Sequence, residues 1–161
     1  MQKTPDGRVI TVSSDSHYRT FFIPEKAKDP SCYFVLQAYK ESKLANVLFT
    51  REFNDLQRGL SPRAFAVDPG LVNTEIGFKG TNGLVKTVWN WRQSKGVSPE
   101  IPSRTILYLA QEDSVLDSDE IYWYLCKPKQ QSKLSRNMNL ARRLWIESCK
   151  LCGLPIPIIK G

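Results

Sequence analysis

Two short apolar runs separated by a long amphipathic segment dominate the first half of the chain. The segment GRVITVSS, residues 7–14, is rich in β-branched side chains and follows a Pro-Asp-Gly turn, which predicts a strand. Residues 37–59 carry apolar side chains at helical spacing and end at a glycine, which predicts an amphipathic helix. A second apolar run, residues 63–67, is closed by Asp68-Pro69-Gly70. A strand, a helix and a strand in this order predict a right-handed crossover within a parallel sheet.

The pattern of the second half is looser. Residues 71–98 hold glycines around an apolar patch with two tryptophans, which predicts a lid-like loop containing a short helix. We expect a helix over residues 103–111 after Pro102, a third strand over 120–124, a long helix over 132–149 and then an extended tail. The predicted fold class is therefore α/β, with about three strands and flanking helices.

Length and composition fit one soluble domain. The chain has 161 residues, of which 41% are hydrophobic and 24% charged. No run approaches the ~18 apolar residues that span a bilayer, and the N-terminus has no apolar signal core, so a transmembrane or secreted protein is disfavoured. Four irregularly spaced cysteines do not form a disulfide scaffold, which indicates a reducing, intracellular compartment. No metal site is expected, because the pair Cys149 and Cys152 has no second pair and His17 is the only histidine.

The net charge of +7 comes from one end of the chain. Residues 1–125 hold 15 basic and 15 acidic residues, whereas residues 126–161 hold eight basic residues and one acidic residue. This basic C-terminal helix and tail is most simply a solvated helix face, and contact with an anionic membrane surface is the alternative. A charge confined to one segment, without a recognised binding fold, argues against nucleic acid as a partner.

The pair Tyr39 and Lys43 carries the candidate chemistry. Residues four apart lie on one face of a helix, so the phenol and the ammonium point the same way. A nearby cation lowers the pKa of a phenol, which makes it usable as a proton donor or acceptor near neutral pH. Ser14 ends the first strand and Asp68-Pro69-Gly70 ends the second, so three elements converge on the carboxyl edge of the sheet, where α/β folds bind ligands.

Three motifs in this order resemble a known family. VSSDSH, AYKESKLANVLF and VDPGLVNTEI resemble the C-terminal half of a short-chain dehydrogenase/reductase, which has a doubly wound, Rossmann-type sheet. SKLANVLFTRE and LARRLWIESCKLCGLP resemble the retinol dehydrogenase branch of that family. The resemblance runs from about Gly7 to Pro155, so the whole chain is interpreted as one partial domain, the catalytic half.

The resemblance implies a role for each matching residue. Tyr39 would be the catalytic acid/base, Lys43 would hold the nicotinamide ribose, and Ser14 would bind the substrate oxygen. The residues implied at the nicotinamide side of the cofactor, besides Tyr39 and Lys43, are Pro69, Gly70, Val72 and Thr74.

The implied reaction is hydride transfer between NADP or NAD, with NADP favoured, and an apolar carbonyl or alcohol such as a retinoid, sterol or lipid aldehyde. Residues 71–98 occupy the position of a substrate lid, and an ordinary core segment is the alternative interpretation.

The same resemblance exposes a deficit. The Gly-rich turn that holds the pyrophosphate, the residue that reads the ribose 2′ position and the Asn-Asn-Ala-Gly segment are absent from the sequence. We therefore expect a truncated enzyme that is weakly active alone, with an exposed apolar edge on the first strand.

The alternative is a non-enzymatic remnant. It would pair with a full-length relative, or form a homodimer, through the helix from Tyr39 to Leu56, or it would dock on membranes by its basic end. Localisation stays open between the cytoplasm and a membrane such as that of the endoplasmic reticulum.

Overall fold

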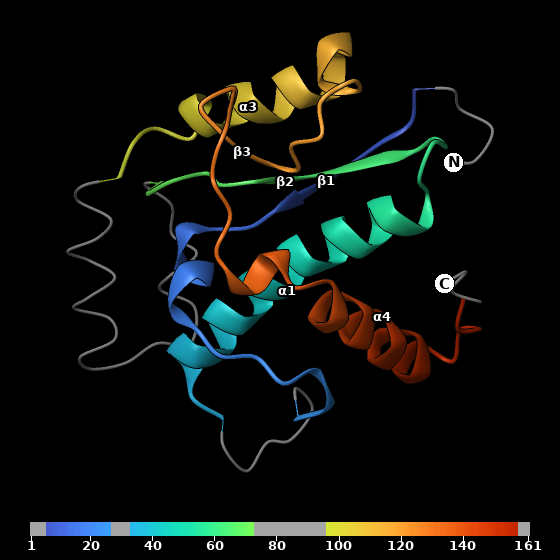
Figure 1. Cartoon of the computed structure of the whole chain (residues 1–161). Coiled ribbons are helices and arrows are strands. Elements are labelled where there is room, and N and C mark those ends of the chain that lie inside the picture. The colour runs from blue at the N-terminus through green and yellow to red at the C-terminus, as the bar shows by residue number, and fades with distance from the viewer. Residues whose placement is uncertain (1–5, 27–32, 73–95, 158–161) are drawn as a thin grey trace.

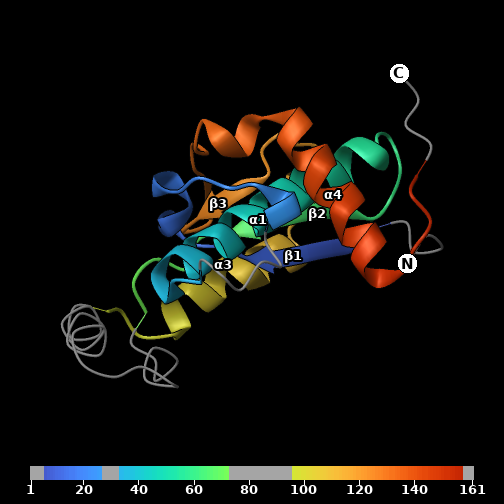
Figure 2. The same ribbon diagram turned by 90° about the horizontal axis from the view of Figure 1, so that it is seen from below.

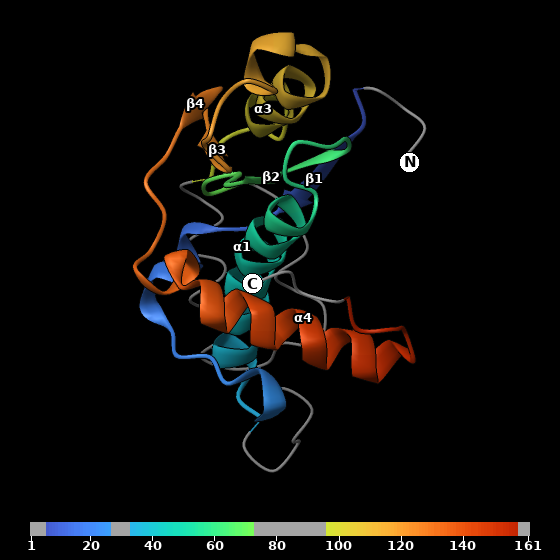
Figure 3. The same cartoon turned by 45° about the vertical axis from the view of Figure 1, so that its right-hand side comes forward.

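A four-stranded sheet separates helix α3 from helix α1, and helix α4 packs on the far side of α1 (Figures 1 and 3). This computed structural model describes residues 6–26, 33–72 and 96–157. The strands are β1 (Arg8–Val12), β2 (Arg63–Val67), β3 (Tyr122–Tyr124) and β4 (Lys127–Pro128). The helices are α1 (Val35–Leu56), α3 (Glu100–Gln111) and α4 (Met138–Cys152), with short 3-10 turns at η1 (Asp15–Arg19), η2 (Pro24–Lys26), η5 (Asp113–Val115) and η6 (Leu134–Arg136).

The sheet confirms the predicted α/β class and adds a strand. Its order is β1-β2-β3-β4, with β1, β2 and β3 parallel and β4 antiparallel to β3. Val12 pairs with Val67, and Val67 pairs with Trp123. Strand β4 was not predicted, because its two residues are too few to show a periodicity.

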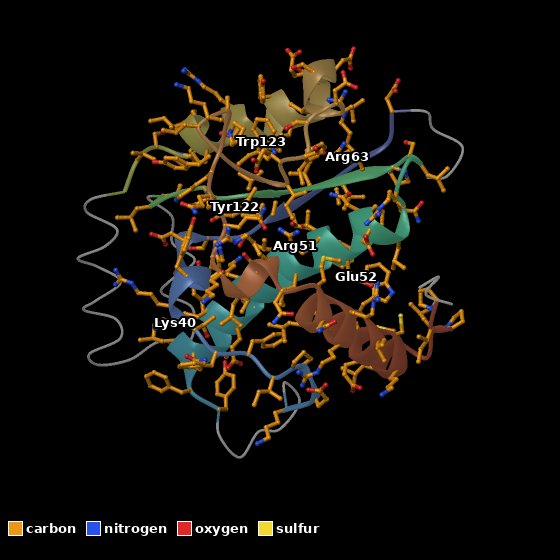
Figure 4. The ribbon with its side chains drawn as sticks, in the orientation of Figure 1. Lys40, Arg51, Glu52, Arg63, Tyr122 and Trp123 are labelled. Carbon is orange, nitrogen blue, oxygen red and sulfur yellow. The ribbon has the colours of Figure 1, made fainter. Side chains whose placement is uncertain are left out.

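Strand β2 is central, and its alternate side chains serve two cores. Phe65 and Val67 pack with Leu109 of α3 and with Trp123, whereas Ala66 faces α1. Figure 4 shows the same alternation in β3, where Tyr122 lies on the α1 side and Trp123 on the α3 side. The continuous apolar sequence RAFAV is what a parallel strand covered on both faces requires.

Strand β1 lies at the edge of the sheet. The Arg63 N–H donates to the Gly7 carbonyl at 2.8 Å and the Ser13 N–H donates to the Val67 carbonyl at 2.7 Å, so the odd-numbered residues face β2. The main-chain groups of Arg8, Ile10 and Val12 therefore point to the opposite edge, where the described residues supply no strand. The predicted exposed edge is present in the part of the chain that the structure describes.

Helices α1 and α4 form the third core. Leu44 and Leu48 of α1 pack against Leu140 and Ala141 of α4, and the ring of Phe49 stacks on Trp145 with 5.4 Å between centroids. Figure 2 shows α4 crossing α1 at this contact. The predicted second long helix begins later than expected, at Met138, because the side chain of Asn137 caps it by accepting a hydrogen bond from the Leu140 N–H at 3.0 Å.

Several basic residues of segment 126–161 form ion pairs. Arg143 donates to Glu25 at 2.7 Å, and Arg142 of α4 contacts Glu52 and Asp55 of α1 at 3.3 Å. Part of the charge that the sequence concentrates in this segment is therefore compensated by acidic residues of the first half, rather than being left on a solvated face.

Candidate catalytic edge of the sheet

Tyr39 and Lys43 lie one turn apart near the start of α1, on one face of the helix as predicted. The Lys43 ammonium is 5.4 Å from the centroid of the Tyr39 ring, and both residues are half-buried. The pair arises because α1 begins at Val35, which puts both residues in its first turns, beside the carboxyl end of β1.

The end of β1 is hydrogen-bonded to this part of α1. The Lys43 ammonium donates to the Val12 carbonyl at 3.2 Å, and the Asn46 side chain donates to the same oxygen at 2.9 Å. In return, the Ser13 hydroxyl donates to the main-chain carbonyl of Lys43 at 2.8 Å. Burial lowers the pKa of Lys43. These contacts fix the candidate lysine against the strand end.

Ser14 follows β1 and is buried. Its hydroxyl oxygen accepts from the Ser16 N–H at 3.2 Å, which caps η1. The hydroxyl has two acceptors within reach, an Asp15 carboxylate oxygen at 3.3 Å and the Ser16 hydroxyl at 3.2 Å. The hydroxyl proton therefore has local acceptors in this structure, and a substrate oxygen would compete with them.

His17 holds the main chain of Ser14. Its Nδ1 lies 2.6 Å from the Ser14 carbonyl, and its Nε2 faces the Ser132 N–H at 3.3 Å. This pattern assigns the proton to Nδ1, because Nε2 must accept. Burial lowers the pKa of His17, which favours the neutral ring. The histidine thus positions the strand end without a free nitrogen for proton transfer.

The Pro69-Gly70 turn lies at the same edge as the Tyr39 face. The Asp68 carboxylate accepts from the Gly70 N–H at 2.9 Å, and Gly70 has a φ of 68°, which favours glycine. Val72 then forms a parallel bridge with Val97. The predicted cofactor residue Thr74 lies outside the described residues, as does the predicted lid except residues 71–72 and 96–98.

Sequence reasoning missed the partner of Asp68. The Lys129 ammonium donates to the second Asp68 oxygen at 2.5 Å, although 61 residues separate the two. Asp68 was visible as a strand-end residue, whereas Lys129 was only one cation of the basic segment. No spacing rule joins residues this far apart, so only the turn after β3 could have hinted at the contact.

Within the described ranges, no three His, Cys, Asp or Glu side chains gather as a metal site would need. Of the helices that the structure describes, none has the length and apolar content to cross a bilayer.

Known proteins resemble the chain over nearly its whole length. Human polyprenol dehydrogenase is 33% identical over 152 residues, which are 91% of this chain and 45% of that protein. Mouse retinol dehydrogenase 11 is 28% identical over 156 residues, 97% of this chain and 49% of that protein. The chain thus spans about half the length of the curated relatives it matches. No protein-family model matches it.

A solved structure is also similar to the chain in fold and in sequence. The crystal structure of an uncharacterized protein from Mycobacterium paratuberculosis superimposes with a TM-score of 0.63 at 28% identity, covering 95% of this chain and 53% of that one. The chain is therefore similar to about half of the retinol and polyprenol dehydrogenases, which are members of the short-chain dehydrogenase/reductase family.

Proposed function

We propose that the chain is the catalytic half of an NAD(P)-dependent oxidoreductase that interconverts an apolar alcohol and its carbonyl compound. The observation that carries this proposal is the Tyr39–Lys43 pair, with the ammonium 5.4 Å from the ring, fixed to the end of β1. The names of the relatives, retinol and polyprenol dehydrogenases, support the apolar substrate class.

The proposed chemistry assigns proton transfer to this chain. Tyr39 takes the hydroxyl proton of an alcohol, or gives a proton to the oxygen of a carbonyl. The Lys43 ammonium offsets the negative charge that develops on the phenol oxygen. The Ser14 hydroxyl donates to the substrate oxygen by turning its proton away from Ser16 and Asp15. The nicotinamide, when bound, accepts or supplies the hydride.

The residues present fit one end of the cofactor. The Lys43 ammonium is a donor suited to ribose hydroxyls, and the Pro69-Gly70 turn follows β2 at the same edge of the sheet. The sequence offers no Gly-rich turn for the pyrophosphate and no residue for the ribose 2′ position. These residues do not select between NADP and NAD, so both cofactors are tested.

A fluorescence titration with NADPH and NADH tests the proposal. We expect saturable binding that Lys43→Met weakens about tenfold, the loss of roughly one charged hydrogen bond. We expect Tyr39→Phe to retain most of the binding and to abolish any turnover of retinal or a polyprenal. The control is Lys40→Met, which removes the same charge three residues before Lys43 on α1 and is expected to bind as wild type does.

Absence of binding by the folded protein would contradict the proposal. The open edge of β1 favours the alternative in that case, a non-catalytic partner of a full-length relative. Co-purification with such a relative, and the cosedimentation of the chain with anionic vesicles, would then separate pairing from membrane contact.

A further inference from the structure

The two oxygens of the Asp68 carboxylate have different partners. One accepts from the Gly70 N–H at 2.9 Å and the other from the Lys129 ammonium at 2.5 Å. Only 1% of the Asp68 side chain is exposed, so both bonds form where water competes little. The carboxylate therefore links Lys129 to the Pro69-Gly70 turn.

The β3–β4 hairpin places Lys129 beside Asp68. The Lys129 N–H donates to the Tyr122 carbonyl at 2.8 Å, which continues the hairpin beyond β4. Its ammonium lies 4.8 Å from the centroid of the Tyr124 ring and 5.8 Å from that of Tyr18. Burial lowers the pKa of Lys129, but the hydrogen bond to Asp68 and its charge outweigh burial, and the net direction is upward.

The Tyr124 ring forms the second contact with the turn. A Cβ atom placed on Gly70 would lie 3.0 Å from Cε2 of Tyr124, so the ring rests against the glycine. Lys129 thus touches both groups that hold Gly70, the carboxylate that accepts its N–H and the ring that covers its α-carbon.

We propose that Lys129 is a positioning residue for the nicotinamide side of the cofactor: it orients Asp68 and Tyr124, which together fix the Pro69-Gly70 turn. This inference rests on the proposed function for its purpose, but its geometry stands on the contacts above. The alternative is that Lys129 only neutralises the buried Asp68 carboxylate. In that case, removing Lys129 would loosen the Pro69-Gly70 turn only as far as it lowers the stability of the whole protein.

Hydrogen exchange of the Gly70 amide, measured by NMR, tests the positioning directly and needs no cofactor. We expect Lys129→Met to speed exchange at Gly70 at least tenfold, the equivalent of losing one charged hydrogen bond, and to weaken NADPH binding by a similar factor. Lys129→Arg is expected to restore both, since a guanidinium can still pair with the carboxylate. Lys127→Met, a charge removal two residues earlier on exposed β4, is the matched control.

The double variant Asp68→Asn/Lys129→Met separates positioning from stability. It leaves no unpaired buried charge, so its urea midpoint is expected to recover towards wild type. Gly70 exchange is expected to stay fast, because no cation orients the side chain of residue 68. The proposal is overturned if Gly70 exchange in these variants simply follows global stability, or is unchanged in Lys129→Met. If wild type shows slow Gly70 exchange that depends on Lys129 but binds no NADPH, the proposed function fails and the positioning does not.

Discussion

Glu52 is a buried carboxylate with only part of its hydrogen-bonding capacity satisfied. It lies on α1 facing α4 and is 1% exposed, and Figure 4 shows it in the layer between the two helices. One oxygen accepts from Arg142 at 3.3 Å and the other has no hydrogen-bond partner. Burial raises the pKa of Glu52 more than Arg142 lowers it. Its ionised form is therefore a cost to the folded state.

Glu52→Gln is expected to stabilise the protein at neutral pH. Because folding raises the pKa of Glu52 above 4.5, the folded state binds the carboxyl proton more tightly than the unfolded state does. The free energy of unfolding therefore falls as the pH rises from the pKa of the unfolded state through that of the folded state. Thermal unfolding at pH 7 should show a higher midpoint for the variant, by about 2–4 °C for each kcal/mol regained.

At pH 4, where Glu52 is protonated, the two proteins should melt together. Asp55→Asn removes the other carboxylate that Arg142 contacts, at a more accessible position, and should not stabilise the fold. If Glu52→Gln lost stability at pH 7, this would contradict the conclusion that ionised Glu52 destabilises the folded state.

At the scale of elements, the β3–β4 hairpin contains the most strained backbone among the described residues. Its two central residues, Leu125 and Cys126, have φ values of 47° and 58°, a conformation that Asn-Gly adopts readily and that Leu-Cys does not. The Cys126 N–H donates to the Thr105 hydroxyl at 3.2 Å, which ties the turn to α3. The hairpin that contains this turn also places Lys129 beside Asp68.

Leu125→Asn with Cys126→Gly is expected to raise the free energy of unfolding by about 1–2 kcal/mol, the left-handed penalty less the entropy that glycine adds to the unfolded chain. Urea unfolding measures the change. Leu125→Ala is the control: Leu125 is half-exposed, so truncation removes little packing and leaves the strain in place. Equal midpoints for the double variant and wild type would show that the turn stores no strain.

The sequence predicts the elements that show a long periodic pattern of apolar residues. It does not predict features that depend on a single contact. β1, α1 and β2 follow from repeated spacing, and helical spacing also places Tyr39 beside Lys43. The start of α4 depends on one cap from Asn137, and β4 follows a turn without glycine or asparagine. The contact between Asp68 and Lys129 depends on the whole sheet being assembled. Sequence patterns are local, so they miss such contacts.

At the scale of the molecule, the β1 edge of the sheet is less buried than the central strand β2. No residue of β1 is fully buried, whereas Ala64 to Val67 of β2 all are. Val12 is 42% exposed, and its side chain points to the α3 face with that of Ile10, away from Lys43. A half-exposed apolar edge strand is a template for association between chains.

Val12→Lys is expected to slow association of the purified chain several-fold, because a charge on an edge strand opposes strand pairing. Light scattering over time at fixed protein concentration measures the rate. Leu107→Lys adds the same charge on exposed α3, off the sheet edge, and should have a smaller effect. Equal effects would indicate that net charge, not the edge, controls association.

The Val12 carbonyl also connects that edge with the candidate site. It already accepts two hydrogen bonds, from Lys43 and Asn46, which use both lone pairs of the oxygen. A strand that paired with β1 as far as Val12 would have to displace one of these donors. Where Lys43 is the donor displaced, growth of the sheet and placement of the lysine are thermodynamically linked, and the added strand changes the position of the lysine without touching Tyr39.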